Sequence, residues 1–128
     1  KKSSRLGIIA TGSKEKIVLL LYNYEESDEE QVSGNDIINI QLSGLENKSN
    51  YKVESLVLDE KSNNTYQSWI AVGSPKNSKS IDLTTLKKAA TLDVSKHFEL
   101  ETNADGQVNL AINLKRRSAQ ILLIHPND

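Results

Sequence analysis

The chain of 128 residues contains no cysteine and no methionine, and only six of its residues are aromatic. Without cysteine it can form no disulfide, no thiolate metal site and no thiol nucleophile. Its two histidines, His97 and His125, lie far apart in the sequence and belong to no cluster of His or acidic residues. Metal sites and catalytic triads are built from such groupings. The sequence therefore predicts no metal site, no catalytic triad and no cofactor.

An excess of charge of one sign is also absent, because the formal net charge is −1. Nucleic acids and anionic membranes attract strongly basic surfaces, so neither is an expected partner. The longest apolar run, Ile17–Tyr22, is far shorter than the roughly 20 residues of a membrane-spanning helix. The lack of cysteine is neutral on compartment, because it suits a cytosolic protein and does not forbid secretion. The composition, rich in Lys, Asn, Ser and Ile, suggests a bacterium. We therefore expect a cytoplasmic location in a bacterium.

The N-terminus lacks the apolar segment of a signal peptide. The chain opens on Lys1-Lys2-Ser3-Ser4 without methionine, which suggests a piece of a longer protein. Its length fits one domain with a substantial core. We expect residues 1–128 to be a single accessory domain cut from a larger polypeptide.

Most of the chain reads as β-strands joined by short turns. Ile17–Tyr24 is apolar on both faces, which is typical of a strand that is covered on both sides or central in a sandwich. Other segments, such as Val108–Leu114, alternate apolar and polar residues and predict half-buried strands. The turn Asn103–Gly106 predicts a hairpin that pairs Val108–Leu114 with Phe98–Thr102. Seven such strands predict an all-β fold, an antiparallel β-sandwich.

A short two-helix insertion interrupts these strands at about residues 63–91. Tyr66, Trp69 and Ile70 share one face of the first helix, which Asn63, Asn64 or Thr65 can cap. Gly73 and Pro75 are expected to end it. In the second helix, residues 83–90, Asp82 is the expected cap, and Ile81 and Leu86 form a hydrophobic staple.

The insertion carries an ordered pattern that resembles the C-terminal part of glycoside hydrolase family 39, which contains β-xylosidases and α-L-iduronidases. The resemblance extends from about Leu6 to Ile124 and includes the strand end Tyr22-Asn23-Tyr24 and the closing strand Ala119–Ile124. The pattern within the insertion is Asp59-Glu60, then Asn64-x-Tyr66-x-x-Trp69-x-x-x-Gly73-Ser74-Pro75, then the leucine-bearing helix 83–90.

The resemblance implies a β-sandwich appended to a catalytic (β/α)8 barrel of the same polypeptide. In that family the two catalytic glutamates lie in the barrel, so the resemblance places no catalytic residue on this chain. The carboxylates of the chain also lack the paired arrangement that glycoside cleavage requires. We therefore expect the chain alone not to be an enzyme, although the parent protein can be a glycosidase.

The candidate contact residues lie in and beside the first helix. Tyr66 and Trp69 either pack against a neighbouring domain or the sandwich, or offer an aromatic platform to a carbohydrate. Packing is favoured, because an apolar helix face more often packs than binds a ligand. The residues expected to contact another domain or a ligand are Asp59, Asn64, Tyr66, Trp69 and Pro75.

Other interpretations remain open. The same domain can stand at the C-terminus of an arabinose-responsive (AraC-type) transcription regulator whose body resembles this glycosidase family, or act as an independent carbohydrate-binding module. A strand from elsewhere in the parent protein can complete the sandwich, which would leave an unpaired edge here. The acidic loop Glu25–Glu30 is expected to be solvated, because it lacks the ligand spacing and the glycine of a calcium loop.

Overall fold

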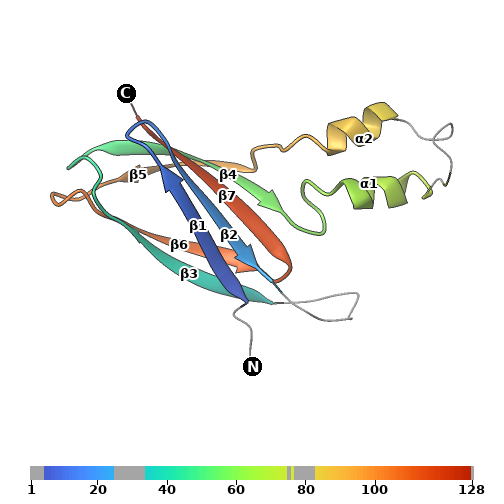
Figure 1. Cartoon of the computed structure of the whole chain (residues 1–128), viewed down its shortest axis with the longest axis horizontal. Coiled ribbons are helices and arrows are strands. Elements are labelled where there is room, and N and C mark those ends of the chain that lie inside the picture. The colour runs from blue at the N-terminus through green and yellow to red at the C-terminus, as the bar shows by residue number, and fades with distance from the viewer. Residues whose placement is uncertain (1–4, 25–33, 75, 77–82, 128) are drawn as a thin grey trace.

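The computed structural model describes residues 5–24, 34–74, 76 and 83–127. Within these ranges the chain forms strands and two short helices, α1 and α2, which lie between the fourth and fifth strands (Figure 1). The elements are β1 (Leu6–Gly12), β2 (Ile17–Asn23), β3 (Asn35–Leu42), β4 (Asn50–Leu58), α1 (Thr65–Ala71), α2 (Leu83–Ala89), β5 (Lys96–Glu101), β6 (Val108–Lys115) and β7 (Ser118–Pro126).

The strands form two antiparallel sheets, so the predicted all-β sandwich is confirmed. One sheet has five strands in the order β1-β2-β7-β4-β5, and the other consists of β3 and β6. β2 lies inside the larger sheet between β1 and β7, as its apolar sequence predicts. The two-helix insertion also lies within the predicted range.

The hydrophobic core fills the space between the two sheets. The predicted alternation of β6 is correct, because Leu110, Ile112 and Leu114 are buried while the residues between them are exposed. Of these, Ile112 and Leu114 belong to one buried cluster with residues of β2, β4 and β7. The buried cluster consists of Leu19, Leu21, Tyr51, Val53, Ile112, Leu114, Leu122 and Ile124.

The predicted hairpin between β5 and β6 is wrong. β5 pairs with β4, whereas β6 pairs with β3 in the other sheet. The turn after Asn103 forms, with the Gly106 amide donating to the Asn103 carbonyl oxygen, but it carries the chain from one sheet to the other. Gly106 is required there for close approach, because a Cβ on it would lie 2.2 Å from the Leu45 carbonyl oxygen.

The smaller sheet covers only part of the larger one. Among the described residues, β3 and β6 pair only with each other, so each has one free edge. Leu6 and Ile8 of β1 share the inner face with the core strands, since Ile8 pairs with Leu21, yet both are exposed. The inner face at β1 therefore lacks a covering strand within the described part of the chain.

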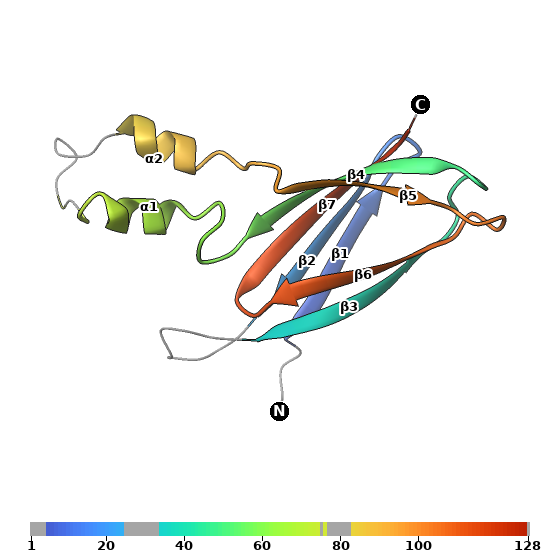
Figure 2. The same ribbon diagram turned by 180° about the vertical axis from the view of Figure 1, so that it is seen from behind.

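The two helices project from the sandwich as an arm, which extends to the right in Figure 1 and to the left in Figure 2. Three predicted features of the insertion, the contact residue Pro75, the cap Asp82 and the staple residue Ile81, lie outside the described residues. The acidic loop Glu25–Glu30 lies outside them as well.

Candidate functional site

The arm is held at its root by the side chain of Asn63. Its amide nitrogen donates to the Val57 carbonyl oxygen at 2.8 Å and to the Asp93 carbonyl oxygen at 3.3 Å. Its amide oxygen accepts from the Asp93 backbone nitrogen at 2.9 Å. Asn63 has a φ of 53°, a left-handed conformation that asparagine tolerates better than most residues. One side chain thus ties the outgoing segment of the arm to the returning segment.

Asp59 organises the turn that leads into the arm. Its carboxylate accepts from the backbone nitrogens of Lys61 at 2.8 Å and Ser62 at 2.6 Å, and Lys115 Nζ lies 3.8 Å away. The Asp59 side chain is only 8% exposed. Burial acts to raise the pKa of this carboxyl, but the hydrogen bonds from Lys61 and Ser62 and the charge of Lys115 together lower it below 3.8. Asp59 is therefore an ionised structural acceptor at neutral pH.

Asn64 is the residue that caps α1. Its side-chain oxygen accepts from the Gln67 backbone nitrogen at 3.3 Å, which satisfies one free amide of the first turn. Its amide nitrogen donates to the carbonyl oxygens of Asp59 at 3.2 Å and Glu60 at 3.4 Å. The structure therefore brings two predicted contact residues, Asp59 and Asn64, together, and their interactions fix the arm from within.

At its other end α1 stops as predicted. The Gly73 backbone nitrogen donates to the Ile70 carbonyl oxygen at 2.9 Å, and the Ser74 nitrogen donates to the Trp69 carbonyl oxygen at 3.0 Å. Gly73 has a φ of 92°, which favours glycine at this position.

The two faces of α1 have opposite polarity, and the apolar face points away from the companion helix. The face toward α2 is polar and borders a hollow of about 330 Å³. Across that hollow lie Lys88 and Thr91, at the end of α2 and just beyond it. The residues that α1 and its cap contribute to the hollow are Asn64, Gln67, Ser68 and Ala71.

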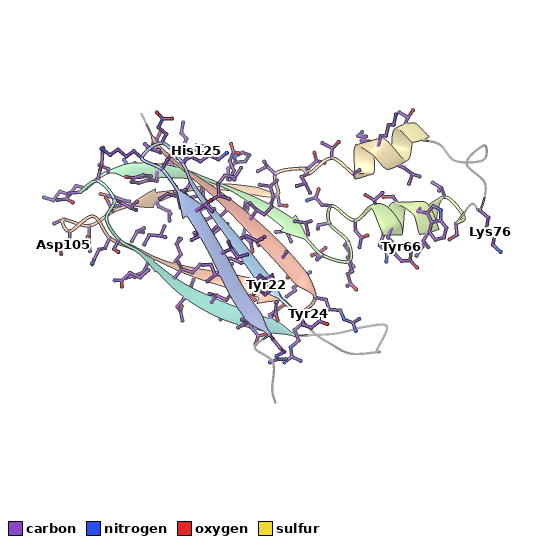
Figure 3. The ribbon with its side chains drawn as sticks, viewed as in Figure 1. Tyr22, Tyr24, Tyr66, Lys76, Asp105 and His125 are labelled. Carbon is purple, nitrogen blue, oxygen red and sulfur yellow. The ribbon has the colours of Figure 1, made fainter. Side chains whose placement is uncertain are left out.

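The opposite face of α1 carries the two aromatic residues. The rings of Tyr66 and Trp69 stack, with centroids 5.8 Å apart and planes inclined by 28°. Tyr66 is 62% exposed, Ile70 is also exposed, and no residue of α1 is buried. Figure 3 places Tyr66 on the projecting arm, apart from Tyr22 and Tyr24 on the sandwich. The predicted pairing of Tyr66 with Trp69 on one face is confirmed, and that face does not pack on the sandwich.

Other kinds of site find no support in the described residues. No group of three or more His, Asp or Glu side chains there is arranged to hold a metal ion. No helix among those residues has the length and apolar character needed to cross a membrane.

Sequence comparison finds no relative, since no protein-family model matches the chain and no curated protein matches it significantly. Comparison of structures finds similar proteins of known structure. A GH39 enzyme from Xanthomonas axonopodis pv. citri superposes with a TM-score of 0.72 at 15% identity, over 94% of this chain and 26% of the enzyme. A monomeric β-xylosidase from Caulobacter crescentus gives 0.70 at 14% identity, over 94% of this chain and 26% of that enzyme.

A bacterial orthologue of human α-L-iduronidase also superposes, with a TM-score of 0.65 and 16% identity, over 95% of this chain and 22% of that protein. The fold is that of one part of GH39-type enzymes. This result confirms the resemblance seen in the sequence. The chain spans only about a quarter of the length of the enzymes that it matches.

Proposed function

We propose that this chain is the non-catalytic accessory β-sandwich of a GH39-type protein and that its arm packs against a (β/α)8 barrel of the same polypeptide. The observation that carries the proposal is the near-complete superposition of this chain on a quarter of two GH39-type enzymes. A domain of this kind supports a larger enzyme and needs no catalytic group of its own. A bacterial cytoplasmic location is part of the same proposal.

The polarity of α1 supports the arm as a contact element. A helix normally turns its apolar stripe toward the rest of its own protein. In α1 the exposed Tyr66 stacks on the half-buried Trp69, on the face opposite Gln67 and Ser68, which border the hollow toward α2. Aromatic residues are enriched at the centres of protein interfaces. The outward face of α1 therefore suits a partner domain.

Fluorescence of Trp69, the only tryptophan of the chain, tests this contact. In the isolated 128-residue chain we expect red-shifted emission that is readily quenched. In the full-length polypeptide, the difference spectrum between wild type and Trp69→Phe isolates the same indole, and we expect it to be blue-shifted and protected. Blue, protected emission in the isolated chain would show instead that the arm folds back on its own sandwich.

A carbohydrate is a second candidate partner, favoured by the stacked rings of Tyr66, which is exposed, and Trp69, which is half-buried. Aromatic faces of this kind stack on pyranose rings. Under this alternative, xylo-oligosaccharide added to the isolated chain shifts the Trp69 emission, and Tyr66→Ala weakens the response. Under the docking proposal the sugar leaves the emission unchanged. No feature of the structure favours the transcription-regulator alternative over either of these.

A further inference from the structure

The outer face of the five-stranded sheet carries an apolar row where a solvated face is expected. Ile9 of β1 pairs with Leu20 of β2, Leu20 pairs with Ile121 of β7, and Ile121 pairs with Leu56 of β4. Directly paired residues share one face of a sheet, so these four side chains form a line across four strands. They alternate with the core residues Leu19, Leu21 and Leu122, which identifies the line as the outer face.

Neighbouring rows extend this apolar area on both sides. Val18 pairs with Leu123 in the next row, and both are half-buried. In the row on the other side, Tyr22 lies over Gly7, where an added Cβ would be 2.0 Å from the tyrosine Cζ. Glycine at this position lets the aromatic ring lie across β1, so Tyr22 becomes part of a flat apolar surface.

The other end of the same face has ordinary surface chemistry. Lys52 and Glu54 of β4 and His97 and Glu99 of β5 point outward there. An antiparallel sheet with one solvated face is expected to be polar on that face. One sheet thus has a polar outer face at its β5 end and an apolar outer face at its β1-β2-β7 end.

The apolar face is closed at β4, where Leu56 is buried, and open toward β1. Between them, Leu20 and Ile121 are half-buried. The smaller sheet reaches the larger one through contacts of β6 with β2 and β7, and these lie on the core side. Ile9 is consequently 55% exposed and Tyr22 is 41% exposed. The apolar sequence of β2 predicts that both of its faces are covered. Among the described residues, only its inner face packs in the hydrophobic core.

The uncovered area is continuous with the base of the arm. Its last row runs from Tyr22 through Ala119 to Leu58, where β4 ends and the segment that leads into the arm begins. A hollow of about 400 Å³ lies at this corner. Its lining residues are Tyr22, Asn23, Tyr24, Leu58, Arg117, Ser118 and Ala119. Figure 3 shows both tyrosines at this end of β2. A partner domain that contacts this corner of the sheet would therefore also lie close to the base of the arm.

We infer that the outer face of β1, β2, β7 and the end of β4 is the surface on which the rest of the GH39-type polypeptide docks, and this inference rests on the proposed function. The matched enzymes extend well beyond the matched part, since the chain covers 26% of each. A tethered body of that size meets the face at high effective concentration. The hollow takes an apolar side chain of that body against Tyr22, Tyr24, Leu58 and Ala119, beside the polar residues Asn23, Arg117 and Ser118.

Single introduced cysteines test the assignment, and the chain has no cysteine of its own. Thiol labelling is followed by peptide mass mapping for Ile9→Cys in the isolated chain and in the full-length polypeptide. We expect labelling to slow by about tenfold or more in the full-length polypeptide, which corresponds to about 1.4 kcal/mol of docking free energy. Thr11→Cys, on the same face of β1, is a second reporter if Ile9→Cys does not fold. Glu99→Cys, on the charged end of the face, is the matched control and should label equally in both proteins.

Tyr66→Cys, labelled in parallel, separates the two proposals. Protection of Tyr66→Cys without protection of Ile9→Cys overturns the sheet-face inference and leaves the docking of the arm standing. Protection of neither site overturns both proposals, as does a mature polypeptide that contains only these 128 residues.

Protection of Ile9→Cys in the isolated chain that disappears on dilution identifies a second copy of the chain as the occupant. Equal protection at Glu99→Cys removes the distinction between the two ends of the face. Either of these last two results overturns the inference.

Discussion

At the scale of single residues, the arm shows which roles a sequence reveals and which it hides. Asn64 is one of three caps that the sequence allows for α1, and capping depends on residues within one turn. The role of Asn63 depends on Val57 and on Asp93, which is 30 residues away. Only the tertiary structure brings Asp93 to it. From the sequence, Asn63 is only one of the candidate caps for α1, a residue type that also accepts a positive φ.

Asp59 gives a prediction about pH. Its folded-state pKa is lowered, so the stability it contributes is fully present above its ordinary value of 3.8 and is lost as pH falls through the folded-state pKa. We expect Asp59→Asn to reduce the free energy of unfolding at pH 7 by on the order of 1 kcal/mol. The difference from wild type should shrink at pH 3 and below. Urea unfolding of wild type and Asp59→Asn at pH 7 and at pH 3 measures this difference in the free energy of unfolding. A difference of the same size at pH 7 and at pH 3 would contradict this account.

Leu110 tests the inward face of β6. It is 7% exposed, whereas its neighbour Asn109 is exposed. Truncation by Leu110→Ala removes buried methyl groups and should lower the free energy of unfolding by roughly 2–5 kcal/mol. Asn109→Ala is the matched control, with an expected change within about 0.5 kcal/mol. Equal effects of the two changes in urea unfolding would show that the assigned face is wrong.

At the scale of elements, the strands were predictable and their partners were not. Period-two alternation depends on which residues face the core, so β6 could be located from the sequence alone. The Asp105-Gly106 turn predicts that β5 pairs with β6. A turn fixes only the local backbone, however, and here the contact of Gly106 with the 45–49 loop directs the chain into the other sheet.

Thr102 holds this corner between the sheets. Its hydroxyl donates to the Glu46 carbonyl oxygen at 2.5 Å and accepts from the Ser49 backbone nitrogen at 2.9 Å, and the residue is 3% exposed. Thr102→Val keeps the shape and removes both bonds, so the free energy of unfolding should fall by roughly 1–3 kcal/mol. Thr102→Ser keeps the hydroxyl and should retain most of the stability in urea unfolding. A smaller loss for Thr102→Val than for Thr102→Ser would mean that the methyl group holds the corner.

At the scale of the whole molecule, three features leave apolar surface exposed, and the docking proposal accounts for each of them. The arm turns its aromatic face outward, the larger sheet has an uncovered apolar end, and the smaller sheet leaves Leu6 and Ile8 exposed. The sequence anticipated the first through the spacing of Tyr66 and Trp69, and the second through the two apolar faces of β2. It could not anticipate the third, because the pairing of β3 with β6 alone is a property of the tertiary fold.

The same view predicts that the isolated chain hydrolyses no glycoside. Cleavage requires two carboxyl groups on opposite sides of a bound sugar, about 5–10 Å apart. Asp59, the carboxylate most strongly held by the fold, is occupied by the Lys61 and Ser62 amides and is 8% exposed. The isolated chain incubated with an aryl xyloside should release the aryl group no faster than a buffer blank, at any pH from 4 to 8. Turnover above the blank that a single carboxylate-to-amide change in this chain abolishes would place a catalytic site on the sandwich and overturn its accessory role.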